Sequence, residues 1–118
     1  MFTLLLVSLT SCTLDRKVDP VSELRSEAFD AVRRSIMDEG SAAFENLPQQ
    51  VMPTIGAVCG QVSIESSSDE DRQTRPFFYV RGQPVLIAKD QASQGEVADR
   101  CRRASTEVEE MKLLPISQ

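Results

Sequence analysis

The chain has 118 residues, a net charge of −5, 41% hydrophobic residues and 26% charged residues, as expected of one globular domain with a single modest core. Aromatic residues make up only 5% of the chain and Trp is absent, so we predict a thin, largely aliphatic core. The lack of His excludes Ser–His and Cys–His catalytic pairs and removes the commonest zinc ligand, while the negative charge disfavours nucleic acid as a partner.

The N-terminal segment is apolar and ends at a cysteine. Residues 2–9 form a run far shorter than the roughly 20 residues needed to span a bilayer, and similar in length to the apolar region of a signal peptide. The run leads into Leu9-Thr10-Ser11-Cys12, which resembles the lipobox of bacterial lipoproteins, where an aliphatic residue and two small residues precede a lipidated cysteine. The alternative is a short apolar strand that ends in an unmodified cysteine.

The lipobox resemblance implies that residues 1–11 are a signal peptide and that Cys12 carries diacylglycerol and an N-acyl group such as palmitate. Several acyl chains anchor a protein stably, because each buried CH₂ contributes about 0.8 kcal/mol. Thr13, rather than Asp, follows the cysteine. By resemblance to Gram-negative sorting rules, this favours the outer membrane, with the protein facing the periplasm.

A tether and a first helix are predicted after the cysteine. Residues 12–19 are polar and lack periodicity, which indicates a tether. Asp19 and Pro20 are typical of an N-cap and a first helical position, and apolar residues then recur at helical spacing over residues 20–38. Gly40 follows, where a helix C-terminus prefers glycine.

Loops and three strands are predicted in the middle of the chain. A short turn over 41–46 and a proline-containing loop over 47–54 precede a strand over 55–64, and two further strands follow over 77–81 and 85–88. The first strand has two faces, one formed by Val58, Gly60, Val62 and Ile64 and the other by Ala57 and Cys59.

The second predicted strand contains three consecutive aromatic residues, Phe77, Phe78 and Tyr79, so at least one ring points to the face opposite its neighbours. A type II′ turn with Gly82 at its first central position is expected to join this strand to the next. An outward aromatic strand near a sheet edge could bind a protein partner by strand addition. The alternative is that a helix or loop covers this second face.

A long amphipathic helix is predicted over residues 94–113, opened by a capping box at Ser93. Its basic residues Arg100, Arg102 and Arg103 form a patch that could bind an anionic lipid headgroup or an acidic partner. The alternative is a solvated helix face with internal ion pairs between residues four apart.

A disulfide is predicted between Cys59 and Cys101. The export signal places the folded part in an oxidising compartment, and lipidation of Cys12 leaves only these two cysteines. Because Cys59 lies in the first strand and Cys101 on the apolar side of the long helix, the bond would join helix to sheet. The alternative is two buried free thiols that pack as small apolar side chains.

These elements predict a single α+β domain over residues 20–118, with a three-stranded antiparallel sheet and both helices packed on one face. Residues 32–46 and Val58-Cys59-Gly60-Gln61-Val62 resemble a group of small, uncharacterised proteobacterial envelope and prophage-associated proteins with a Val-Cys-Gly-x-Val strand. The resemblance implies a related fold and transfers no catalytic residue; we also expect no metal and no cofactor. We therefore expect a non-enzymatic envelope lipoprotein that contacts another protein; the alternative is an exclusion, immunity or inhibitor lipoprotein of a mobile element or prophage.

Overall fold

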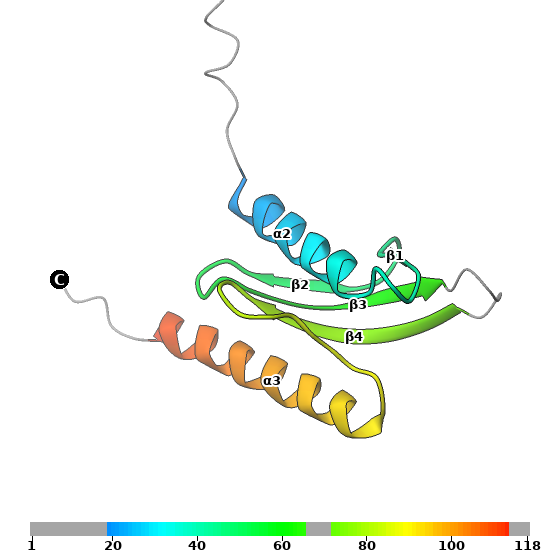
Figure 1. Cartoon of the computed structure of the whole chain (residues 1–118). Helices are drawn as coiled ribbons and strands as arrows, with labels where there is room; N and C mark the ends of the chain where they lie inside the picture. Colours follow the sequence, from blue (N-terminus) through cyan, green and yellow to red (C-terminus); the bar gives the residue numbers. More distant parts are fainter. Residues whose placement is uncertain (1–18, 66–71, 114–118) are drawn as a thin grey trace, which may run out of the picture.

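The computed structural model describes residues 19–65 and 72–113, in which an antiparallel sheet lies between two helices (Figure 1). The predicted α+β class is therefore confirmed, but the sheet has five strands in place of the predicted three. In chain order, the elements are α2 (Pro20–Ser35), β1 (Ser41–Ala43), β2 (Gln49–Met52), β3 (Ala57–Glu65), β4 (Arg72–Val80), β5 (Leu86–Ile87) and α3 (Gln91–Leu113).

The two helices lie on opposite faces of the sheet, so the prediction that both pack on one face is wrong (Figure 1). The physical reason is the alternation of side chains along β3. Val58 and Val62 pack with α2, whereas Ala57 and Cys59 pack with α3. Since all four side chains are buried, helices on one face alone would leave the other apolar face in water.

The predicted start of α2 is confirmed by its capping contacts. Asp19 is the N-cap, and its Oδ1 accepts a hydrogen bond of 3.1 Å from the backbone N–H of Val21. The helix ends at Ser35 rather than at residue 38, because Ile36 already has non-helical dihedral angles, φ −108° and ψ 14°. The backbone N–H of Gly40 then donates to the carbonyl of Ile36 at 3.1 Å in the turn that leaves the helix.

The strands β1 and β2 pair with the same edge of β3, in segments predicted to be a turn and a loop. Pro48 and Pro53 directly flank β2, so they bound the strand instead of preventing it. Neither β1 nor β2 pairs with Gln61 of β3. The side chain of Gln49 fills this gap, because its Nε2 donates to the Gln61 carbonyl at 3.0 Å.

The longest pairing joins β3 and β4, from Ala57 opposite Val80 to Glu65 opposite Arg72. The strand β4 begins at Arg72 rather than at residue 77, since backbone pairing continues through a polar segment whose side chains do not alternate in hydropathy. The turn after β4 also differs from the prediction. Gly82, with φ +86°, is the second central residue of a turn closed by the Gln83 N–H and the Val80 carbonyl, which is where a type II turn requires glycine.

The sheet divides the core into two unequal parts. The side facing α2 holds the large buried residues, namely Leu24, Val32, Ile36, Phe44, Val58, Val62, Ile64, Phe77 and Ile87, with Ala28. On the side facing α3, the described residues form a smaller cluster of Met52, Ala57, Cys59 and Ala104, and α3 also buries Val97. The helix α3 is therefore attached to the sheet by less apolar surface than α2, and this difference affects the site built around it.

Candidate functional site

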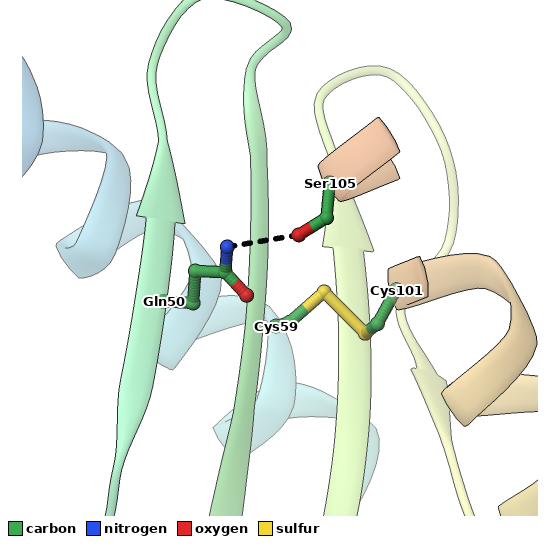
Figure 2. The surroundings of a disulfide bond; sticks show 4 residues. All are labelled: Gln50, Cys59, Cys101 and Ser105. Atoms are coloured by element: carbon green, nitrogen blue, oxygen red, sulfur yellow. Dashed lines mark hydrogen bonds between the residues drawn. A yellow bond between two sulfur atoms is a disulfide. The ribbon is translucent and has the colours of Figure 1, made fainter. Parts of the chain in front are cut away.

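The pair Cys59 and Cys101 joins β3 to α3 as a disulfide, with Cα atoms 5.9 Å apart (Figure 2). This separation is inside the limit of about 7 Å for bridging two cysteines without backbone movement, so the predicted pairing is confirmed. Cys59 is only 8% exposed in the middle of the sheet, whereas Cys101 is half-buried on the flank of the helix. The bond connects positions 42 residues apart in the chain.

A hydrogen bond beside the disulfide also links α3 to the sheet. The Gln50 side chain of β2 donates from Nε2 to Oγ of Ser105 at 3.0 Å, one helical turn beyond Cys101 (Figure 2). This hydrogen bond is exposed to solvent. Because water competes for exposed donors and acceptors, such a bond contributes only about 0.5–1.5 kcal/mol.

A groove of about 530 Å³ runs beside the disulfide, between the first half of α3 and the sheet. Its lining includes both cysteines together with Gln50, Gln61, Pro76 and Val97, and no charged side chain is among its lining residues. A molecule that enters this groove to reach the sulfur atoms must therefore fit its shape, and it meets no charged lining residue there. The chemistry available there is thiol–disulfide exchange, in which a thiolate attacks a disulfide sulfur.

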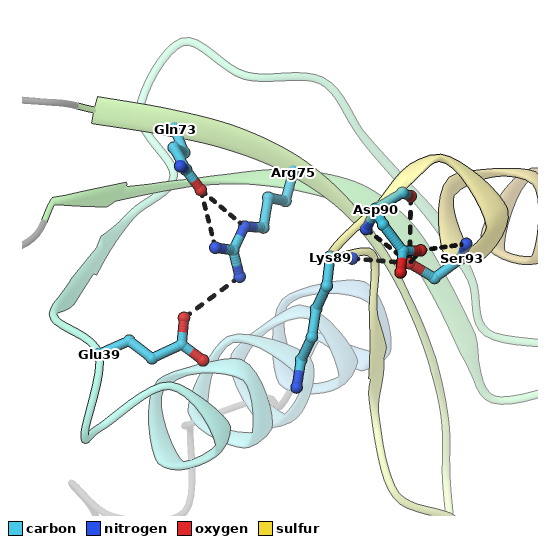
Figure 3. A network of polar contacts seen from close by, with 6 residues as sticks. All are labelled: Glu39, Gln73, Arg75, Lys89, Asp90 and Ser93. Carbon is cyan, nitrogen blue, oxygen red and sulfur yellow. Dashed lines mark hydrogen bonds and ion pairs between the residues drawn. The ribbon is translucent and has the colours of Figure 1, made fainter.

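The start of α3 is held by reciprocal hydrogen bonds between Asp90 and Ser93 (Figure 3). Asp90 Oδ1 accepts from the Ser93 N–H at 2.8 Å, and Ser93 Oγ accepts from the Asp90 N–H at 2.9 Å. Asp90 is therefore the N-cap, so the predicted cap at Ser93 is wrong by one turn and the helix begins at Gln91. The backbone N–H and the hydroxyl of Ser93 lower the pKa of Asp90, because they bind its ionised form.

The three consecutive aromatic residues are covered by other elements. Phe77 is fully buried and packs edge-to-face against Phe44, with ring centroids 6.2 Å apart. Tyr79 packs on the same side, whereas Phe78 packs with Ala104 on the side of α3. The strand β4 also lies between β3 and β5. Phe78 and Tyr79 are only half-buried, and β5 pairs with Phe77 and Phe78 alone, so binding of a partner at this strand remains a prediction.

The predicted arginines lie on the exposed side and flank of α3, where Arg100 and Arg103 also line a shallow pocket with Phe78 and Val80 of β4. All three pair with acidic residues of the same helix. Arg100 contacts Glu96 at 3.1 Å, Arg103 contacts Asp99 at 2.8 Å, and Arg102 also pairs with Asp99. The side chains of Arg102 and Arg103 remain 69% and 75% exposed. Internal pairing of this kind is what a solvated helix face predicts, and binding of a partner remains a prediction.

A polar cluster that sequence reasoning missed joins α2 to the end of β4. The Arg81 guanidinium donates to both carboxylate oxygens of Glu27, at 2.8 and 3.0 Å, and the Tyr79 hydroxyl donates to the same carboxylate at 3.4 Å. Hydrogen bonding from Arg81 lowers the pKa of Glu27, while burial and the nearby Glu27 carboxylate raise the pKa of Tyr79. No local pattern signals this cluster, because Glu27 and Arg81 are 54 residues apart.

A second such contact holds the turn after α2 against β4 (Figure 3). Arg75 donates to Glu39 Oε1 at 3.2 Å and twice to the Gln73 side-chain oxygen, at 2.7 and 3.1 Å. Its side chain is only 19% exposed. These contacts join the turn after α2 to β4.

Cys12 lies outside the residues that the structure describes. In residues 19–65 and 72–113, no helix is both long enough and apolar enough to span a bilayer. The same ranges contain no group of three or more His, Cys, Asp or Glu side chains arranged to hold a metal ion.

Comparison with protein-family models, curated proteins and solved structures finds no match for this chain. Its role must therefore be inferred from its own residues and their geometry.

Proposed function

We infer that the chain is a lipid-anchored lipoprotein of the bacterial cell envelope, whose folded domain acts by binding another protein and not by catalysis. The observation that carries this proposal is the use of the three cysteines. Cys59 and Cys101 are paired, and disulfides persist in oxidising compartments outside the cytosol. Cys12, at the end of a lipobox-like sequence, is then the one thiol left for lipidation.

The titratable groups support a role without catalysis. In the described part of the chain, the shifted pKa values belong to Glu27, Tyr79, Arg81 and Asp90. Catalytic groups typically combine a shifted pKa with a position in a cleft. Here each shift has a structural cause: the Glu27–Arg81 ion pair for these two groups, burial beside Glu27 for Tyr79, and a helix cap for Asp90.

The outer surface of α3 is the face that we assign to the partner. Arg102 is exposed on this surface, and Arg100 and Arg103 lie beside it at the border between α3 and the sheet. Their neighbours Glu96 and Asp99 pair with them only through exposed contacts, which contribute little free energy and can be exchanged for the carboxylates of an acidic protein surface. Exposed charges of this kind act mainly on the rate and specificity of association.

The anchor is tested by replacing Cys12 with serine in cells fed radiolabelled palmitate. Wild-type protein should take up label and sediment with the outer membrane, whereas Cys12→Ser should do neither, because the thiol that carries the acyl groups is missing. The matched control is Cys59→Ser, which should keep its label. Equal labelling of Cys12→Ser and the wild-type protein would show that the chain is not lipidated at this cysteine.

The partner surface is tested by placing a photocrosslinking residue at Arg102 of α3 or, as a control, at the exposed Glu23 of α2. In intact cells, the probe at position 102 should give a discrete crosslinked protein and the probe at position 23 should not. The reverse pattern, or identical products from both positions, would contradict the assignment of α3 as the binding face.

A further inference from the structure

Besides the disulfide, few buried side chains hold α3 against the sheet. The helix has 23 residues, but among the described ones only Val97 and Ala104 are buried apolar side chains, at 2% and 6% exposure. Cys101 and Val108 are half-buried on the same stripe. Met111 continues that stripe and is 42% exposed, so the last turns of the helix gain little from the sheet.

Polar contacts add little to this attachment. The ion pairs of α3 in the described chain join residues within the helix, and the side-chain hydrogen bond to the sheet is the exposed Gln50–Ser105 contact. By contrast, α2 buries Leu24, Ala28 and Val32 completely and also holds β4 through the Glu27–Arg81 ion pair. The two helices therefore differ in what would hold them in place if the disulfide were broken.

The two cysteines also differ in exposure. Cys59 is 8% exposed in the middle of the sheet, whereas Cys101 is half-buried on the flank of α3, and both residues line the neutral groove of about 530 Å³. An incoming thiolate must reach a sulfur atom to attack it. The Cys101 Sγ is the atom that this geometry presents.

We propose that Cys101 is a thiol-exchange site and that its reaction with a dithiol reductant releases α3 while α2 and the sheet stay folded. A thiolate of the dithiol bonds to Cys101 Sγ, the Sγ–Sγ bond breaks, and its electron pair leaves on Cys59 as a thiolate that takes up a proton. The second thiol of the reductant, once deprotonated, then displaces Cys101, which is also protonated. The protein disulfide is reduced by two electrons and the dithiol becomes a disulfide.

Release of α3 would uncover the second face of the sheet. Ala57 and Phe78 pack against this helix, and their exposure would create an apolar surface next to the former groove. The proposal depends only on the folded domain and is independent of the lipid anchor.

The site of attack is tested with the full chain carrying Cys12→Ser, so that only Cys59 and Cys101 can react. The oxidised protein is exposed briefly to glutathione, quenched with N-ethylmaleimide and mapped by mass spectrometry. Glutathione is expected on Cys101, with the maleimide on Cys59. Glutathione on Cys59, or in equal amounts on both residues, would refute the assignment.

The release of α3 is tested by hydrogen exchange before and after the same protein is treated with dithiothreitol. Peptides from α3 should exchange at least about tenfold faster after reduction, and peptides from α2 should change less than about twofold, as expected for local opening. Gln50→Ala is the matched control, because in the oxidised state it removes the hydrogen bond but keeps α3 protected. Equal acceleration of both helices, or none in α3, would overturn the proposal.

Discussion

Replacing Gly60 with alanine tests how β2 is held against β3. A Cβ atom at this position would overlap Oε1 of Gln49, and it would lie 2.8 Å from Cδ of Gln49 and 3.1 Å from Cζ of Phe77. The Gln49 side chain would therefore have to move away. Its hydrogen bond to the Gln61 carbonyl, 3.0 Å in the wild-type protein, would be lost.

Two opposing effects set the size of the change. A part-buried carbonyl left without a partner costs about 1–3 kcal/mol, whereas alanine is favoured over glycine inside a strand by about 0.5–1 kcal/mol, because glycine loses more backbone entropy on folding. Phe77 is fully buried, so its ring can yield little to the new methyl group. We expect Gly60→Ala to lower the free energy of unfolding by about 1–2 kcal/mol.

The assay is a double-mutant cycle with Gln49→Ala, measured by urea denaturation. In the Gln49→Ala background, the overlap and the hydrogen bond are already gone. There only the Phe77 contact at 3.1 Å remains, and the strand preference for alanine over glycine offsets it. Gly60→Ala should then cost less than in the wild-type protein, which gives a coupling energy of about 1 kcal/mol or more. The same cost for Gly60→Ala in both backgrounds would refute the role assigned to Gln49.

Three further predictions concern stability. Joint replacement of Cys59 and Cys101 by alanine should lower the free energy of unfolding, measured with denaturant, by up to about 4 kcal/mol on the chain-entropy model, and a loss below about 1 kcal/mol would contradict that model here. Phe77→Ala should cost about 3–5 kcal/mol and lower the denaturation midpoint; a midpoint equal to that of the wild-type protein would contradict its place in the core. The ion pair with Arg81 lowers the pKa of Glu27 below its ordinary value of 4.5, so its stabilisation is present above pH 4.5 and lost as the pH falls below it. The melting temperatures of wild-type protein and Glu27→Gln should therefore converge in acid, and a constant difference between them would contradict this linkage.

Local patterns were sufficient for several features of the fold. Asp19 before Pro20 predicted the start of α2, because an N-cap depends only on nearby backbone N–H groups. The alternation along β3 predicted which side chains share a face. Counting cysteines predicted the Cys59–Cys101 pair, since two partners allow only one intramolecular bond.

Only the tertiary structure decided the features that depend on distant partners. The strands β1 and β2 are three and four residues long and exist because β3 supplies their hydrogen bonds, so no local periodicity predicts them. The contact of Glu27 with Arg81 likewise requires α2 to lie over β4. The sequence by itself determined that both faces of β3 carry buried side chains. The path of the chain determined that one helix covers each face. The reason is that a helix can bury its apolar side only against the face that its connecting loop allows it to reach.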